Sequence, residues 1–432
     1  MKKIILWSVV GIFIVGICAA AFWWWSRPQV IQLDKNTKLT LLGVEYGKHH
    51  KFPNIKVVGR RVGGGPTFFD TTNDTVVVWI LQETKGRQQY GWQALVYDRA
   101  ETGCVMNWSA NWRSAGANRQ IAAVQLDAFP RWDRKFIMRF TSWGPQGQHT
   151  SKEQFVISNP GRERTFSKWT PELLPDTQSD DDLDVTLTKF NYGVPFNRGS
   201  GMPAKDPATQ AVLVAFHTEQ KGVVVTNWQP VRIETSDATG NYVFNNSWST
   251  SRDENGDATM TYQSGLWPEQ TPWKLRVEFS RDSGFHPDEL WSVSDDPVQP
   301  GRWQDLWNYG GRNNRSTNSA FAETTLNGVH LEIFPVVQTT DQNYGNGQKS
   351  GGVRVTAEPD LPDGYRLTVT ATDEDGHQLQ SWGPNGGGGN YVVQFPNIRN
   401  ARTLNFTIAL HKSRFVEFTA TPEKAAQSGN EQ

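Results

Sequence analysis

A stretch of the sequence occurs twice, and this internal repeat limits the folds open to the chain more than any other feature. Val76 to Trp92 matches Val212 to Trp228 at a constant spacing of 136 residues, with the same valines, Glu, Lys-Gly pair and Trp. Further on, Trp112 and Trp248 have the same spacing. Repetition at a fixed period indicates that one structural unit has been built more than once. The sequence therefore predicts a series of similar domains.

The repeated units have the pattern of β-strands. Short alternating or β-branched segments, such as Thr75 to Leu81 and Tyr365 to Thr372, recur between clusters of Gly, Asn, Asp and Pro. Strands at this spacing favour antiparallel sandwiches over α/β units. An aromatic-Pro pair followed by two strands, the last of them at residues 155–160, 291–297 and 415–422, occurs three times and indicates three units. Residues 326–331 are predicted to be the opening strand of the third unit. We predict an all-β ectodomain of three tandem immunoglobulin-like β-sandwiches, at residues 31–160, 183–297 and 322–422.

The connections between these units show the composition of linkers. Trp169 to Asp184 contains two prolines and the acidic run Asp180-Asp181-Asp182, and Pro300 to Asn318 contains Gly and Asn pairs. We expect the acidic run to be a solvated linker. The alternative is a Ca²⁺ ion clamped between domains by Asp180 to Asp184.

The N-terminus predicts a membrane anchor. Met1-Lys2-Lys3 precedes an uncharged run at residues 4–25 that ends in three tryptophans. About 20 apolar residues span a bilayer as a helix, and tryptophans gather where such a helix leaves it. The lysines place the N-terminus in the cytoplasm and the rest of the chain outside. We therefore expect a retained signal-anchor in the cell membrane, with the lipid bilayer as a partner; the alternative is cleavage after Ala19-Ala20-Ala21.

Composition excludes several functions. The chain has 43 basic and 44 acidic residues, a balance that offers no footprint for nucleic acid. The two cysteines are Cys18, inside the apolar run, and Cys104, so the ectodomain cannot close an internal disulfide. No hydrolase elbow, phosphate loop, dinucleotide fingerprint or zinc-protease motif is present. His49-His50 are adjacent and point to opposite sides of an extended chain. We predict no catalytic residues, no metal site and no cofactor.

The chain is rich in tryptophan, with 19 Trp against 10 Tyr. Those that recur at equivalent positions, such as Trp92 and Trp228, are predicted to be core residues. Trp143 and Trp382 do not recur, and each lies in a Ser-Trp-Gly-Pro loop sequence. Because binding residues concentrate on loops held by a rigid scaffold, we predict that Trp143 and Trp382 contact a ligand. The alternative is that each folds back over its own domain.

One short motif resembles a segment found in other proteins. The segment from Leu39 to His50, with the pattern L-T-L-x-x-V-x-Y-G-x-x-H, resembles the opening motif of an uncharacterised group of bacterial membrane-anchored or secreted proteins. The resemblance implies a bacterial, extracytoplasmic setting and brings no known activity with it.

These features together predict a non-catalytic binding or scaffolding protein of the bacterial cell envelope, with an envelope protein or a glycan as its partner. The alternative is a polysaccharide-processing enzyme or an accessory carbohydrate-binding protein, because Asp and Glu pairs serve such chemistry. A transmembrane receptor is a third hypothesis. Only three residues precede the apolar run, so such a receptor would signal through a partner helix.

Overall fold

The computed structural model describes most of the chain after the N-terminal run. The described residues are 28–53, 68–85, 91–101, 104–107, 110–116, 118–144, 147–162, 165–195, 210–245, 248–263, 266–267, 272–302, 306, 319–339, 349–398 and 400–425. The expected all-β architecture is confirmed, since strands form nearly all of the regular structure here, together with the short 3-10 helix η2 (Pro287–Glu289). The predicted membrane helix at residues 4–25 lies outside the described residues. Within them, the structure has no helix with the length and apolarity that crossing a bilayer requires.

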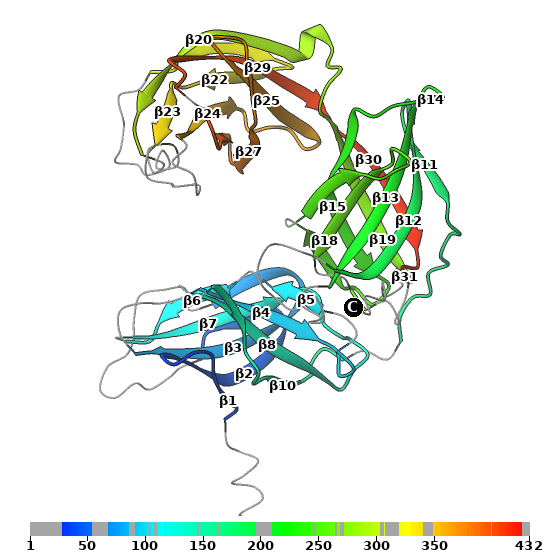
Figure 1. The fold of residues 1–432 in the computed structure, drawn as a ribbon. Coiled ribbons are helices and arrows are strands. Elements are labelled where there is room, and N and C mark those ends of the chain that lie inside the picture. Colours follow the sequence, from blue (N-terminus) through cyan, green and yellow to red (C-terminus); the bar gives the residue numbers. More distant parts are fainter. Residues whose placement is uncertain are drawn as a thin grey trace, which may run out of the picture.

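The strands group into three sandwiches, which we call the N-terminal, middle and inserted sandwiches (Figure 1). The N-terminal sandwich packs a five-stranded sheet against a second sheet, and both contribute side chains to one apolar core. The order in the first sheet is β1 (Val30–Gln32), β2 (Thr37–Lys51), β3 (Phe68–Thr84), β7 (Arg119–Leu126) and β6 (Ala110–Ser114). The order in the second is β10 (Phe155–Ser158), β8 (Lys135–Gly144), β4 (Trp92–Tyr97) and β5 (Cys104–Asn107), with β9 (Gly147–Thr150) beside β8.

The middle sandwich repeats this arrangement. Its first sheet has the order β11 (Asp176–Asp180), β12 (Leu183–Pro195), β13 (Gln210–Gln220), β18 (Ala258–Gln263) and β17 (Trp248–Arg252). Beside that path, β14 (Val223–Val224) pairs with β13, and β31 (Glu423–Lys424) pairs with β12. Its second sheet has the order β16 (Tyr242–Asn245), β15 (Trp228–Asp237), β19 (Trp273–Arg281) and β30 (Arg414–Ala420).

The predicted repeat is confirmed by strand register. Val78 lies opposite Val124 in the N-terminal sandwich, and Val214 lies opposite Met260 in the middle one. A β-bulge also recurs, between Leu41 and Gly43 in β2 and between Leu187 and Lys189 in β12. A bulge adds one residue to one strand and bends it. Its recurrence means that the two units share local irregularities as well as strand order.

The inserted sandwich interrupts the middle one, and this corrects the predicted tandem order. The strand expected to close the second unit, at 291–297, instead belongs to β20 (Leu290–Pro300), which pairs with strands of the inserted sandwich. The strand expected to close the third unit, at 415–422, belongs to β30 and pairs with β19 along its whole length. The boundaries at 297 and 422 therefore do not follow the sheets. The chain leaves the middle sandwich after β19, builds the inserted sandwich, and returns to complete the middle one.

The inserted sandwich has its own strand order. Its strands run in the order β21 (Ala322–Leu326), β22 (Val329–Ile333), β24 (Ser350–Glu358), β23 (Val336–Thr339), β20, β29 (Thr403–Lys412), β25 (Tyr365–Asp373) and β26 (Gln378–Leu379). Beside that path, β28 (Asn390–Phe395) pairs with both β24 and β27 (Trp382–Gly387). β20 links the two layers because it pairs first with β29 and then with β23. The core of this sandwich is a separate cluster of buried apolar side chains.

Two further sequence expectations concern single elements. The segment 326–331, read as one opening strand, is split by a turn at Asn327-Gly328 between β21 and β22. Of the recurring tryptophans, Trp228 is buried in the core as expected, whereas Trp92 is half-buried against it and donates a hydrogen bond to Gln82 (Nε1 to Oε1, 2.8 Å).

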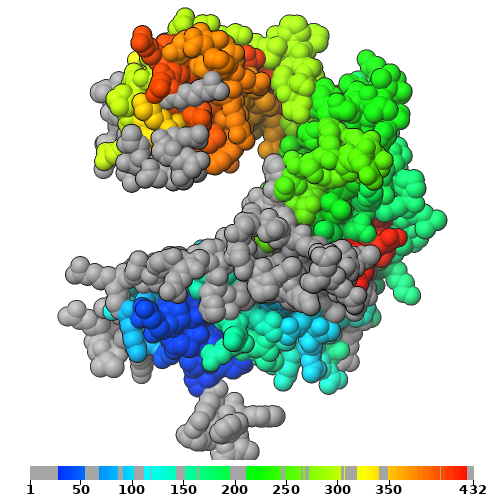
Figure 2. All heavy atoms as spheres, viewed as in Figure 1, coloured from blue at the N-terminus to red at the C-terminus, as the bar shows by residue number. Residues whose placement is uncertain are grey.

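A buried polar contact joins the N-terminal and middle sandwiches. Asn241 accepts hydrogen bonds at Oδ1 from the Phe129 amide (3.1 Å) and from Nε of Arg131 (3.2 Å). Asp237 holds Asn241 in place, since its Oδ2 accepts from the Asn241 side-chain amide (3.0 Å). Asn241 and Phe129 are fully buried. In Figure 2 the inserted sandwich (yellow to orange) adjoins the middle one (green), and the N-terminal sandwich (blue to cyan) lies below the middle one in this view.

Candidate functional site

A groove lies where the inserted sandwich meets the middle one. It has a volume of about 660 Å³. The middle sandwich contributes residues of β15 and β19, and the inserted sandwich contributes residues 360–369 and 381–386 with Tyr391. Clefts of this size at domain junctions are the usual places for ligands. The groove is our candidate functional site.

An ion pair crosses this groove and connects its two walls. Arg366 in β25 donates two hydrogen bonds to Glu278 in β19, from Nε to Oε1 (2.7 Å) and from Nη2 to Oε2 (2.6 Å). The Glu278 side chain is only 3% exposed. Burial alone would raise the pKa of Glu278, but the two hydrogen bonds and the charge of Arg366 outweigh it, so the pKa lies below its usual value. Glu278 is thus a fixed carboxylate.

Trp382 lies on the inserted sandwich's side of the groove. It is the first residue of β27, lies opposite Gln394 in β28, and is 41% exposed. The hairpin that carries it is held close by Gly386, because a Cβ at this position would collide with the carbonyl oxygen of Asn390. The half-exposed indole on this hairpin contributes aromatic surface to the groove.

The same side of the groove holds a second fixed carboxylate. Asp360 accepts hydrogen bonds at Oδ1 from the Tyr391 hydroxyl (2.7 Å), the Gly389 amide (2.8 Å) and the Leu361 amide (2.8 Å). The hydrogen bond from Tyr391 is the main cause that holds the pKa of Asp360 below its usual value. Burial and the same carboxylate raise the pKa of Tyr391. Asp360 therefore fixes the loop and the tyrosine, and both residues keep their charge states at neutral pH.

The states of Glu278 and Asp360 differ from that of a general acid. A general acid at neutral pH needs a carboxyl group with a raised pKa. Glu278 and Asp360 both have lowered pKa values. The groove instead offers aromatic surface from Trp382 and Tyr391 beside charged groups of both signs.

Of the two predicted contact residues, the structure describes the side chain of Trp382 only. Trp382 lines the groove. Trp143 belongs to β8 in the N-terminal sandwich, where its backbone pairs with Gln148 of β9, and its side chain lies outside the described part of the chain. The remaining groove residues, chiefly Glu278, Arg366, Asp360 and Tyr391, were not identified from the sequence. The charge pattern gave no signal for them, because their partners are far apart along the chain.

The acidic run expected in a linker has a structural partner instead. Asp180 ends β11 and accepts a hydrogen bond from the Phe415 amide (2.9 Å). Asp181 and Asp182 accept hydrogen bonds from Nη2 of Arg414, at 3.0 and 3.4 Å. These three residues lie within the middle sandwich and secure the first residues of β30, the strand that returns from the insertion. The run is therefore part of a sheet edge and not a solvated linker.

Comparison of the chain with protein-family models gives no match, and comparison with curated proteins gives none either.

Proposed function

We propose that the chain is a membrane-anchored, extracytoplasmic binding protein that holds a glycan in the groove between the middle and inserted sandwiches, without catalysing a reaction. The observation that carries this proposal is the position of Trp382, half-exposed on a wall of the groove that Tyr391 also lines. Sugar rings stack on aromatic faces through their CH groups, and their hydroxyls pair with charged side chains.

The state of Glu278 and Asp360, two of the four carboxylates that line the groove, supports binding over the alternative of a polysaccharide-processing enzyme. Such enzymes use two carboxyl groups, one of them kept protonated for the leaving group. Glu278 accepts two hydrogen bonds from Arg366, and Asp360 accepts hydrogen bonds from Tyr391 and two backbone amides, so both carboxylates are ionised and held in place.

We also propose that the N-terminal and middle sandwiches are immunoglobulin-like. In both, the sheet orders match the ABED and GFC sheets of that fold, with an additional edge strand in each sheet. In the middle sandwich, β30 takes the place of the last strand. Such sandwiches commonly serve as spacers and binding modules outside the cell, which agrees with the anchor proposed for residues 4–25 and with the setting implied by the Leu39 to His50 motif.

Replacing Trp382 with Ala tests the site. We expect the purified full chain to bind soluble cell-wall polysaccharide fragments at least about 10-fold less tightly after this change, as for loss of an aromatic hot spot. Stability should change by less than about 0.5 kcal/mol, because the side chain is half-exposed. Calorimetric titration measures the affinity and thermal melting measures the stability.

Trp132 offers a matched control. It is 38% exposed and packs on Phe166, away from the groove. Trp132→Ala should leave the affinity unchanged. Equal losses in the two variants, or unchanged binding by Trp382→Ala, would contradict a site in the groove.

The proposed anchor makes a separate prediction about the mature N-terminus. We expect protein recovered from bacterial membranes to retain Lys2 and Lys3 and to resist extraction by high salt, because a 22-residue apolar helix is held by the bilayer core. Terminal sequencing by mass spectrometry checks this. A mature chain that begins near Phe22 would show instead that the segment is a cleaved signal.

A further inference from the structure

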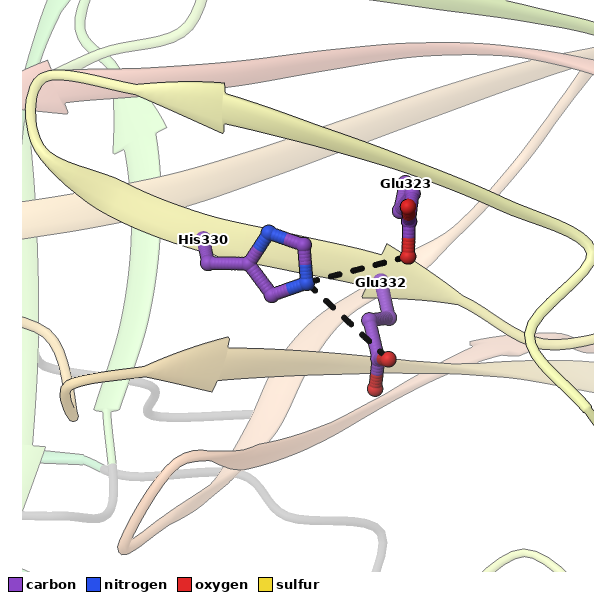
Figure 3. A group of neighbouring side chains, drawn as sticks. All are labelled: Glu323, His330 and Glu332. Carbon is purple, nitrogen blue, oxygen red and sulfur yellow. Dashed lines mark ion pairs between the residues drawn. The ribbon is translucent and has the colours of Figure 1, made fainter.

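Three metal-ligating side chains come together on the outer face of the inserted sandwich. Glu323 in β21 and His330 and Glu332 in β22 point toward one another from a hairpin (Figure 3). Nε2 of His330 lies 3.8 Å from Oε2 of Glu323 and 4.0 Å from Oε1 of Glu332. One donor atom from each residue lies within 4.8 Å of the other two. These residues are separate from the groove and from the proposed glycan contacts.

The local sequence explains this convergence. Asn327 and Gly328 have φ values of 50° and 77°, as the tight turn of a two-residue hairpin requires. The turn places Glu323 directly opposite Glu332. His330 is two residues before Glu332 and so projects from the same face of the strand. The alternate residues Val329, Leu331 and Ile333 are buried in the core and fix the hairpin from below.

The charges on this face are poorly balanced without a cation. Like charges directly opposite each other destabilise a β-sheet. Among the described residues, His330 is the only basic side chain within ion-pair distance of Glu323 or Glu332, and it is charged only when protonated. Both separations are too long for hydrogen bonds. They suit ligands on either side of one ion, since two donors each about 2.1 Å from a zinc ion lie roughly 3–4 Å apart.

Two features support the ligand geometry. Thr356 in β24 donates a hydrogen bond to Oε2 of Glu332 (2.9 Å), which holds the carboxylate and leaves Oε1 facing His330. Outer partners of this kind orient metal ligands in known sites. A cavity of about 530 Å³, lined by His330, Glu332 and Thr356, adjoins the cluster. It gives a further ligand access to the ion position.

We propose that Glu323, His330 and Glu332 bind a divalent transition-metal ion, with zinc as the best fit. One imidazole nitrogen and two carboxylate oxygens form a donor set that zinc accepts, and three protein ligands leave a fourth position open. Ca²⁺ and Mg²⁺ require more oxygen ligands than the cluster provides.

Zinc titration of the full chain, purified without a histidine tag, tests the site. We expect one equivalent of zinc to bind with a Kd below about 10 µM. His330→Gln and Glu332→Gln should each weaken binding at least about 100-fold, and Thr356→Val about 10-fold, because it only orients a ligand. Calorimetry with ZnCl2 gives the stoichiometry and affinity, and circular dichroism shows that each variant is folded.

Two matched variants separate a built site from charge attraction. Glu358→Gln removes one charge opposite His330 on the neighbouring strand without removing a ligand, and should change the affinity less than 3-fold. His217→Gln removes a histidine whose two ring nitrogens face different carboxylates, Asp257 and Glu219, and should have no effect. Absence of zinc binding by the wild-type chain, or equal affinity in His330→Gln, would overturn the proposal.

Discussion

Replacement of Arg366 with Met should lower the free energy of unfolding by about 3 kcal/mol at pH 7. Removing one partner of a buried ion pair leaves the other charge without compensation, at a typical cost of 3–5 kcal/mol. The Glu278 side chain is 3% exposed and receives two short hydrogen bonds from Arg366. We expect the lower end of this range because the charge of Arg232 still acts on Glu278, which can also take up a proton.

The effect should depend on pH in a defined direction. In the wild-type chain the pKa of Glu278 is lowered, so the stability from the pair is present above the usual Glu pKa of about 4.5 and is lost as pH falls through the lowered value. In Arg366→Met, burial without a partner should raise that pKa, and the variant should lose less stability on acidification. The difference between the two proteins should therefore shrink between pH 7 and pH 4, as measured by urea denaturation.

Lys274, which lies in β19 together with Glu278, provides the control. It pairs with Glu417 at 3.0 Å, and both side chains are more than one-third exposed. Lys274→Met should cost less than about 1 kcal/mol, as exposed pairs do. An Arg366→Met protein as stable as the Lys274→Met protein, at every pH, would mean that the Glu278 pair does not hold the two sandwiches together.

The strand pattern could be read from the sequence because it is local. Alternation, turn residues and the repeat spacing predicted β-sandwiches, and the repeat placed Val76 and Val212 at equivalent positions. The order of the domains is not local. The segment at 415–420 has the features of a closing strand, and nothing within it says which sheet it closes. We assigned it to the nearest unit because sequential elements are usually neighbours.

One comparison in the sequence held a clue to the insertion. Phe155-Val156 opens the last strand of the N-terminal sandwich, and Phe415-Val416 lies in β30, the corresponding strand of the middle one. The segment at Trp291 lacks this pair. Two shared residues are a weak signal alone. The paired residues of β19 and β30 are also more than 130 positions apart in the sequence, so no local pattern links them.

The candidate sites were predictable to different degrees. Trp382 could be named as a candidate from the sequence because a tryptophan in a Gly/Pro-rich segment is locally unusual. Glu278 and Arg366 could not be found, since their pairing depends on how the two sandwiches dock. The cluster of Glu323, His330 and Glu332 could have been predicted from the sequence. Asn327-Gly328 is a strong hairpin signal, and reading it as a turn instead of part of a strand would have placed Glu323 opposite Glu332.

Asp296 lies where β20 passes between the two layers of the inserted sandwich. Its burial leads to a second large expected effect, a dependence of stability on pH. The register of β20 shifts between Val293 and Asp296, and the Asp296 side chain accepts a hydrogen bond from the Val336 amide (3.2 Å). Its other oxygen has no hydrogen-bond partner among the described residues. Asp296 is fully buried, and burial raises its pKa to about 7 despite the hydrogen bond from Val336.

A raised carboxyl pKa makes this part of the fold less stable as pH increases. The native state keeps the proton up to about pH 7, whereas an unfolded Asp loses it near pH 3.9. The penalty for ionisation therefore grows as pH rises from about 4 and is complete above pH 7, at up to about 4 kcal/mol. Asp296→Asn removes the titration and keeps an oxygen for the Val336 amide. Between pH 5.5 and pH 8.5 we expect this variant to gain about 2 kcal/mol relative to the wild-type chain in urea denaturation.

The neighbouring residue supplies the control for this pH dependence. Asp295 is exposed and has a φ of 62°, a conformation that Asn adopts equally well. The free energy of unfolding of Asp295→Asn should change with pH in the same way as that of the wild-type chain across this range. If that of Asp296→Asn does so too, then Asp296 is ionised in the folded protein, and a cation or a donor must reach its second oxygen. If only Asp296→Asn diverges, the kink in β20 is held by a neutral carboxyl group, and alkaline conditions should loosen the inserted sandwich before the other two.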